Sequence, residues 1–558
     1  MKHLNSRITQ LSLLILLFVF TSINVKAQPD KDFEISKNLE IFSTLYKQLH
    51  LNYVDDINPG ELMKTGMDAM LESLDPYTVY IPESDIEDYK IMTLGQYGGI
   101  GALIHQRGSW IYISDPYEGF PATKVGLISG DKILEVNGKS AKDKKVEEIS
   151  NMLKGQAGSS IKLLIEREGI SKPIEKEIVR EEIKIDNIPY FGMINDHVGY
   201  IKLTGFTQNA SKEVQDAFLK LKEKNMKALI FDLRGNGGGL LQEAVNIVNL
   251  FVEKDQLVVS TKGKIEERNA VHKTSANPID KNIPIIFLVD RYSASASEIV
   301  SGAIQDLDRG VILGQKTFGK GLVQNVYPLS YNAQMKVTIA KYYIPSGRCI
   351  QALDYSHKKS DGSPERVADS LRNAFKTKNG RMVYDGGGIE PDIAMENETL
   401  SNISVSLITK YLVFDYASKF KRENPILKDT VNFSVTDAIY TDFINFLKGK
   451  DYDYTTQSES KLNELKKAAE NEKYFEAIKP QLDALREKLI HDKEADLMKF
   501  KEEIIQLLKE EIISRYAFQK GRIKASLASD KEIAKAVEVL DNTQLYKSIL
   551  DGSYKKSK

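Results

Sequence analysis

The sequence predicts a multidomain α/β chain in which a β-rich domain precedes a mixed α/β core and an α-helical extension follows that core. With 558 residues the chain is longer than the ~100–200 residues of a usual domain. Its pattern changes from helical periodicity to short strands with glycine turns, and then to strand–loop–helix units. The predicted domains are an N-terminal helical region at 28–88, the β-rich domain at 89–180, the core at 181–398 and a helical C-terminal region at 399–558.

The first 27 residues have the pattern of a secretory signal peptide. Lys2 and Arg7 precede an apolar run from Leu11 to Ile23, and the small residue Ala27 ends the segment. The run is shorter than the ~20 apolar residues that a membrane-spanning helix needs. We therefore expect export to the periplasm or cell envelope of a bacterium, with an uncleaved N-terminal anchor as the alternative.

Composition excludes several function classes. Basic and acidic residues nearly cancel, 77 against 78, which gives no electrostatic reason to expect a nucleic-acid partner. The single cysteine, Cys349, cannot form an internal disulfide or a cysteine-rich metal site. The seven histidines show no metal-ligand spacing such as HExxH. The sequence predicts neither a metal nor another cofactor.

The β-rich segment carries two glycine-containing motifs. Gly99-Ile100-Gly101-Ala102 is a glycine turn that enters a strand, and the run GLISGDKILEVNG begins at Gly126. Together they resemble a PDZ domain of the bacterial protease type, which implies a partly open β barrel. PDZ domains bind a peptide as an added strand and hold its terminal carboxylate on main-chain N–H groups. The resemblance implies that Gly99, Ile100, Gly101 and Ala102 bind such a carboxylate. A plain β-rich structural module is the alternative.

Two loops of the core have the residues that nucleophilic catalysis requires. The strand Ile285–Val289 ends in the turn SASAS, which opens a helix near Glu298, and a second strand is followed by the loop TFGKG with Lys320. A serine hydroxyl needs a base to become a good nucleophile, and a buried lysine can be that base. No histidine lies in either motif, and Phe318 is placed to exclude water from the lysine.

A third loop, GNGGG at 235–239, lies between the strand Ala228–Leu233 and the next helix. It lacks the Lys-Ser/Thr of a P-loop and the spacing of GxGxxG, so a nucleotide-binding role is the weaker alternative. Free N–H groups at a helix start favour negative charge, as an oxyanion hole requires. Asp232 and Arg234 are interpreted as structural anchors of this loop.

The motifs SASASEI, TFGKGLVQ, DLRGNGGGL, YYIPSGR and GGIEPDI resemble those of the carboxyl-terminal processing peptidases, or tail-specific proteases. These are S41-type serine peptidases with a PDZ domain, and the resemblance covers roughly residues 40–395. It implies a crotonase-like core with Ser295 as nucleophile and Lys320, 25 residues further on, as general base. Gln324, about one helical turn beyond, would orient the lysine. The main-chain N–H groups of Ala296 and of a glycine in 237–239, with Gly238 favoured, would bind the oxyanion.

Two other serines lie in the same turn. Ser293 and Ser297 are expected to be packing or capping residues, with Ser297 bonding helix N–H groups. The resemblance selects Ser295 because the family's nucleophile precedes Ala-Ser-Glu.

The C-terminal region predicts charged amphipathic helices. An apolar stripe follows Pro480, while Lys and Glu fill the opposite face; the stripe consists of Leu482, Leu485, Leu489, Leu497, Phe500, Ile504 and Leu508. It is compatible with docking of a periplasmic adaptor or with self-association, and a solvated appendage is the alternative. The whole chain predicts an exported endopeptidase whose partners are protein or peptide substrates with free C-terminal tails. A catalytically silent PDZ scaffold in the cell envelope is the rival.

Overall fold

The computed structural model describes residues 29–396, 399–489 and 493–554, so the predicted signal peptide at 1–27 lies outside the described residues. Two compact units make up the chain, Met1–Tyr80 and Ile81–Lys558. The first unit contains helices α2 (Pro29–Asn52) and α3 (Pro59–Glu72). The side chain of Asn58 caps α3 by accepting hydrogen bonds from main-chain N–H groups of its first turn. No helix of the described residues is long and apolar enough to cross a membrane.

The first part of the second unit is β-rich, as predicted. Its sheet has the strand order β3-β4-β5-β7-β8, with β6 beside β5, and all of these pairs are antiparallel. The edge strand β3 lies next to helix α6. The elements of this part are η1 (Glu83–Asp85), α4 (Ile86–Leu94), β2 (Gln96–Gly99), β3 (Ala102–Arg107), β4 (Trp110–Pro116), α5 (Pro121–Lys124), β5 (Lys132–Val136), β6 (Lys139–Ser140), α6 (Val146–Leu153), β7 (Ser160–Glu166), β8 (Ile174–Val179) and β9 (Glu181–Lys184).

The central sheet follows, with the order β10-β11-β12-β15-β16-β23. Strand β10 is antiparallel to β11, and the other pairs are parallel. Parallel strands are buried on both faces, which explains the continuous apolar runs in the sequence. These strands are β10 (Tyr190–Met193), β11 (Val198–Lys202), β12 (Ala228–Asp232), β15 (Ile285–Val289), β16 (Val311–Gly314) and β23 (Ile393–Ala394).

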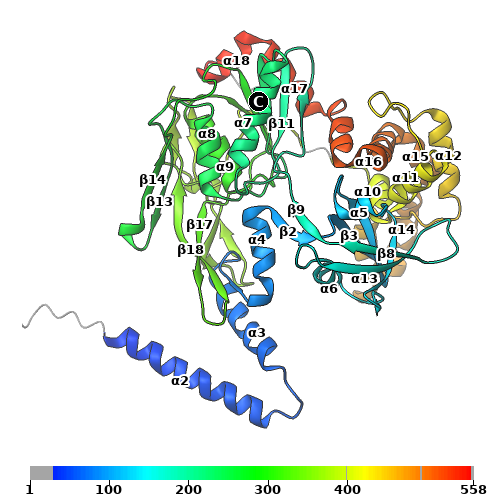
Figure 1. Cartoon of the computed structure of the whole chain (residues 1–558), viewed down its shortest axis with the longest axis horizontal. Helices are drawn as coiled ribbons and strands as arrows, with labels where there is room; N and C mark the ends of the chain where they lie inside the picture. Colours follow the sequence, from blue (N-terminus) through cyan, green and yellow to red (C-terminus); the bar gives the residue numbers. More distant parts are fainter. Residues whose placement is uncertain (1–28, 397–398, 490–492, 555–558) are drawn as a thin grey trace, which may run out of the picture. The chain divides into compact units, whose positions relative to one another are not determined.

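Helices cover both faces of the central sheet (Figure 1). Phe287 packs with α7 (Ala210–Glu223), α8 (Leu241–Asn249) and α9 (Ala296–Asp306). Its neighbour Leu288 points to the opposite face, because successive strand residues alternate. There it packs with α17 (Lys531–Asp541) and α18 (Thr543–Leu550), the last two helices of the chain. The C-terminal end therefore completes the core of the central domain.

A second sheet carries the strand that follows the lysine loop. Strand β17 (Leu322–Pro328) pairs with β18 (Gln334–Tyr343), β18 pairs with β13 (Leu257–Gly263), and β13 pairs with β14 (Ala270–Lys273). The remaining short elements up to residue 384 are β1 (Val79–Ile81), η2 (Glu266–Arg268), β19 (Leu353–Lys358), β20 (Pro364–Arg366), η3 (Asp369–Leu371), β21 (Ala374–Lys376) and β22 (Met382–Tyr384).

The rest of the C-terminal region forms a helical body with its own core. Leu497, Ile504 and Leu508 of the predicted stripe are buried in that core, whereas Leu485 is exposed. Pro480 lies inside its helix, so the helix starts earlier than the stripe indicated. The helices are α10 (Asn402–Thr409), α11 (Leu412–Glu423), α12 (Asp437–Leu447), α13 (Gln457–Asn471), α14 (Phe475–Leu489), α15 (Lys493–Lys499) and α16 (Lys501–Leu527). The predicted order of β-rich domain, mixed α/β core and helical extension is confirmed.

Candidate active site

Ser295 occupies the turn between strand β15 and helix α9. Its main chain has φ 56° and ψ −112°, which is a strained conformation for a residue with a side chain. Two contacts hold the turn: the Tyr342 hydroxyl donates to the Ser295 carbonyl at 3.2 Å, and the Ser295 N–H donates to the Glu298 carboxylate at 2.9 Å. Such strain persists only where the surrounding structure fixes the backbone. Strained residues are found most often at functional sites.

The three serines of the turn have different surroundings. Ser293 and Ser297 are fully buried, and Ser295 is half-buried. The Ser293 hydroxyl donates to the carbonyl of Leu233, and the Ser297 hydroxyl donates to the carbonyl of Asn236. The expectation that Ser297 bonds helix N–H groups is wrong: among the described residues no helix N–H donates to its hydroxyl, which instead donates to the glycine loop. Both buried serines tie the turn to that loop.

The carboxylate of Glu298 joins the serine turn to the lysine loop, a role that the sequence analysis missed. Its Oε2 accepts the main-chain N–H groups of both Ser295, at 2.9 Å, and Lys320, at 2.8 Å. Its Oε1 accepts the Thr317 hydroxyl at 2.6 Å and the Gly319 N–H at 2.7 Å. Burial raises the pKa of Glu298 to about 6, although the four hydrogen bonds oppose that rise. The pattern Ser-x-x-Glu at a helix start was the available signal.

The loop of Lys320 is packed closely against its neighbours. Gly319 has φ +89°, and a Cβ on it would lie 2.4 Å from the Ala352 Cβ, so no other residue fits there without displacement. The N–H of Phe318 donates to the Ser293 carbonyl at 3.1 Å. The Phe318 side chain is 45% exposed, so its expected role in excluding water is not what this structure shows. Lys320 itself is half-buried.

Gln324 lies on strand β17 rather than in a helical turn after the lysine. Its Nε2 donates to the Thr338 hydroxyl of β18 at 3.2 Å. This contact fixes the amide between two strands of the second sheet. The predicted role of Gln324 in orienting the lysine stays a prediction.

The glycine loop lies directly against the serine turn. A Cβ on Gly238, whose φ is +101°, would lie 2.7 Å from the Ala294 carbonyl oxygen and 2.8 Å from the Ser295 Cβ. The Asn236 carbonyl accepts the Ala294 N–H at 3.0 Å. The N–H of Gly238 donates to Oδ1 of Asn236 at 2.9 Å, so this donor would have to leave the side chain before it could bind an oxyanion.

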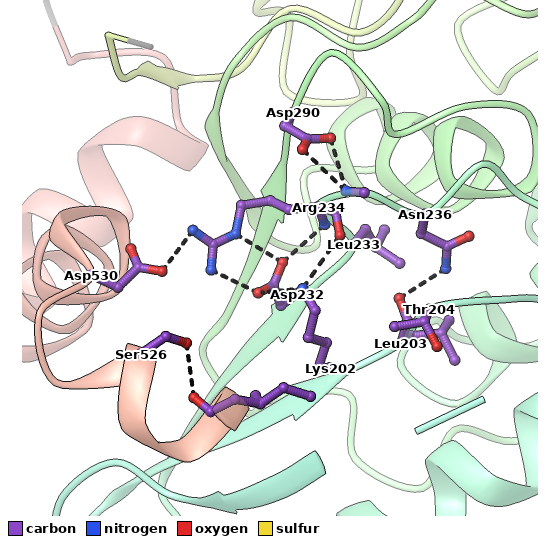
Figure 2. A network of polar contacts seen from close by, with 12 residues as sticks. Lys202, Leu203, Thr204, Asp232, Leu233, Arg234, Asn236, Asp290, Ser526 and Asp530 are labelled. Carbon is purple, nitrogen blue, oxygen red and sulfur yellow. Dashed lines mark hydrogen bonds and ion pairs between the residues drawn. The ribbon is translucent and has the colours of Figure 1, made fainter. Parts of the chain in front are cut away.

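A charged network underlies the start of the glycine loop (Figure 2). Asp232 is fully buried and accepts from Arg234 through Nη2 at 2.7 Å and Nε at 3.0 Å, from Tyr200 at 2.6 Å and from Lys202 at 3.2 Å. Burial would raise the pKa of Asp232, but Arg234 and Lys202 outweigh it and hold that pKa well below its usual range. Arg234 also reaches helix α17, where it pairs with Asp530 and Glu532.

The predicted carboxylate-binding residues lie together between strands β2 and β3. Gly99 ends β2, Ala102 begins β3, and Gly101 has φ +72°. The carbonyl of Ile100 accepts the N–H of Ala122, so its amide plane is fixed. Within the described ranges, the structure groups no three His, Cys, Asp or Glu side chains that could hold a metal ion.

Comparison with protein families identifies each part of the second unit. A model of peptidase family S41 matches residues 197–355, and a PDZ-domain model matches residues 112–167. A model described as the C-terminal helical domain of a probable PDZ-protease matches residues 403–540. The fold and these matches define the class: the chain is a serine peptidase of family S41 with a PDZ domain.

Curated bacterial relatives narrow this class. The "Carboxy-terminal-processing protease" of Bartonella bacilliformis is 33% identical over 343 residues, which are 60% of this chain and 78% of that protein. The "Carboxy-terminal processing protease CtpA" of Bacillus subtilis is 28% identical over 424 residues, covering 76% and 89% of the two chains. The chain belongs to the carboxy-terminal processing protease family. The resemblance, the fold class and the enzyme class predicted from the sequence are confirmed; the domain boundaries and site residues stay predictions.

Among solved structures, the photosystem II D1 C-terminal processing protease shares 26% identity at a TM-score of 0.35, covering 64% of this chain and 93% of that chain. That score is too low to support a comparison of the two folds.

Proposed function

We propose that this chain is an exported endopeptidase that binds the C-terminal tails of proteins through its PDZ domain and cleaves near them by a Ser-Lys mechanism. One observation carries the proposal. The N–H groups of Ser295 and Lys320 donate to the same oxygen of Glu298, so their nitrogen atoms lie no further apart than the sum of 2.9 Å and 2.8 Å. This supports placing nucleophile and base side by side.

The reaction follows from these residues. Neutral Nζ of Lys320 takes the proton of the Ser295 hydroxyl as Oγ attacks the scissile carbonyl carbon. The tetrahedral intermediate then collapses, the C–N bond breaks, and the lysine gives its proton to the leaving amine. Water hydrolyses the acyl-enzyme by the same route, with Lys320 again as base, and Ser295 recovers its proton.

The oxyanion of the intermediate would lie between the serine turn and the glycine loop. Ala296 is the first residue of α9, where N–H groups have no partner within the helix and favour negative charge. Gly238, in contact with the Ser295 turn, would supply the second N–H after that N–H leaves Oδ1 of Asn236. Such close packing of the loop against the serine supports this role over nucleotide binding.

Tail recognition would use the edge strand of the PDZ domain. A peptide added beside β3 would lie between that strand and α6, with its carboxylate on the N–H groups of residues 99–102. We also propose export, on the signal-peptide pattern of residues 1–27. Docking of a periplasmic adaptor and self-association through the C-terminal helices stay predictions.

Cleavage of a tail-bearing protein by defined variants tests the proposal. Ser295→Ala and Lys320→Arg are both expected to lose cleavage while they retain binding of a tail peptide. Arginine is a long basic side chain like lysine, but it cannot act as a base because it stays protonated. Cleavage at the wild-type rate by either variant would refute the Ser-Lys assignment. Loss of cleavage and of tail binding together would indicate misfolding, which circular dichroism would detect.

A further inference from the structure

The last helices of the chain contact the glycine loop through one arginine. Nη1 of Arg234 lies 2.8 Å from Oδ2 of Asp530 and 2.7 Å from Oε2 of Glu532. The other side of the guanidinium holds Asp232. Figure 2 shows this arginine between the carboxylate of β12 and the start of α17. Contacts on both sides fix its position, because guanidinium–carboxylate pairs are directional as well as strong.

These charges are shielded from water. The side chains of Arg234 and Asp530 are both 19% exposed, that of Glu532 is 14% exposed, and Asp232 is fully buried. Ion pairs in such surroundings are less screened than surface pairs. Loss of both α17 carboxylates would free one side of the guanidinium and leave Arg234 with Asp232 alone.

Arg234 is the residue from which the glycine loop starts. The next N–H, that of Gly235, donates to the Asp290 carboxylate at 3.0 Å. The Asn236 carbonyl then accepts from the serine turn, and Gly238 packs on Ser295. A continuous set of contacts therefore runs from α17 through Arg234 and the loop to the serine.

Helix α17 is itself held firmly against the sheet. Its residues Ile533, Ala536 and Val539 are buried on the face opposite α9. In the following helix, the Tyr546 hydroxyl accepts the Ile285 N–H at 3.0 Å, on the strand that leads to Ser295. Burial of these apolar side chains stabilises the packing of α17 on the sheet, so α17 is a rigid support.

We propose that Asp530 and Glu532 are positioning residues for the oxyanion loop, and that through Arg234 the C-terminal helices set the rate of the chemical step. This rests on the proposed function, in which Ser295 is the nucleophile and the glycine loop supplies an oxyanion donor. The two carboxylates touch neither the substrate nor the reacting atoms.

The double variant Asp530→Asn/Glu532→Gln tests the proposal. Asparagine is as good an N-cap as aspartate, so α17 keeps its first turn. Arg234, however, no longer faces the two negative charges of Asp530 and Glu532. Removing an oxyanion donor outright costs about 10²–10³ in kcat, so a displaced donor should cost about 5–50-fold. We expect KM for a tail-bearing substrate to change less than about twofold, because the PDZ domain is untouched.

A pair of ligands separates positioning from general damage. A peptide boronate forms a tetrahedral anion on Ser295 and needs the oxyanion loop, whereas the product peptide of the same sequence does not. Boronate affinity should fall by the same factor as kcat, with product affinity unchanged. Glu538→Gln is the matched control, since Glu538 lies on α17 but pairs with Lys535. Glu538→Gln should match the wild type in kcat, in boronate affinity and in product affinity.

Each outcome is informative. A wild type that binds no boronate would contradict the proposed function itself. A wild type that binds it, with a double variant unchanged in kcat and boronate affinity, would overturn the positioning role alone. Equal losses of boronate and product affinity would also overturn it, because they would indicate general damage. If urea unfolding shows that the double variant is unfolded, Glu532→Gln alone is measured in the same way and judged by the same criteria.

Discussion

Alanine substitutions along the glycine loop separate backbone strain from contact with Ser295, the proposed nucleophile. A Cβ at Gly238 would lie 2.7 Å from the Ala294 carbonyl oxygen, 2.8 Å from the Ser295 Cβ and 2.9 Å from the Ala296 nitrogen. Ordinary contacts begin near 3.4 Å, so the serine turn or the loop has to move by about 0.5 Å or more. The positive φ of +101° adds strain of about 1–2 kcal/mol.

We therefore expect Gly238→Ala to lower the free energy of unfolding by about 2–5 kcal/mol, as overpacking adds about 1–3 kcal/mol to the strain. The displaced serine and oxyanion donor should lower kcat by about 100-fold or more. Urea unfolding measures the first quantity, and steady-state cleavage of a chromogenic peptide measures the second.

The same loop offers two matched controls. Gly235 has φ +73° and nothing within 4 Å of its would-be Cβ, so Gly235→Ala should show strain alone, about 1–2 kcal/mol. Gly237 has neither a positive φ nor a neighbour within 4 Å, so Gly237→Ala should resemble the wild type. The reasoning is refuted if Gly238→Ala is as stable and as active as Gly237→Ala.

Three further predictions concern other contacts. The pKa of Glu298 is about 6 in the folded protein, against 4.5 for an ordinary glutamate. The protonated side chain therefore stabilises the fold below pH 4.5, and this stabilisation is lost as the pH rises through 6. The unfolding free energy of the wild type minus that of Glu298→Gln should fall by about 2 kcal/mol across that range, and a flat difference would contradict the raised pKa. Tyr546→Phe removes two buried hydrogen bonds to the main chain of Ile285 and should cost about 1–3 kcal/mol in urea unfolding; no loss would mean that α18 is not docked there. A Cβ at Gly101 would lie 2.5 Å from the Phe120 Cβ, so Gly101→Ala should raise KM for a tail-bearing substrate roughly tenfold and leave cleavage of a short tail-less peptide unchanged; a lower kcat on the short peptide would argue against a separate tail site.

Local sequence signals predicted the central features well. An apolar run before a glycine loop predicted the parallel strand β12, and one before the SASAS turn predicted β15, because strands buried on both faces must be apolar throughout. The position of Ser295 at a strand-to-helix turn was likewise a local signal, and the structure adds that the other two serines of this turn, Ser293 and Ser297, are buried.

Features that depend on long-range packing were not predicted. Glu298 could be read as part of a capping box, but its contacts to the loop of Lys320 depend on tertiary structure. The carboxylates that Arg234 contacts at the start of α17 lie almost three hundred positions further along the chain; the separation between Arg234 and Glu532 is 298 residues. An amphipathic stripe predicts that a helix face is buried without saying against what, so the docking of α17 on the central sheet could not be foreseen. Gln324 was misplaced because four-residue spacing resembles a helical turn, whereas the adjacent β18 makes the segment a strand.

Mapping the covalent adduct of a serine-directed peptide phosphonate tests the central claim most directly. The account predicts one adduct, on Ser295, in the tryptic peptides of the wild type. It also predicts no adduct in Ser295→Ala and labelling slowed by about 100-fold or more in Lys320→Arg, since general-base catalysis is worth about 10²–10⁴. An adduct on another residue, or undiminished labelling of Lys320→Arg, would contradict the assignment of Ser295 as nucleophile and Lys320 as its base.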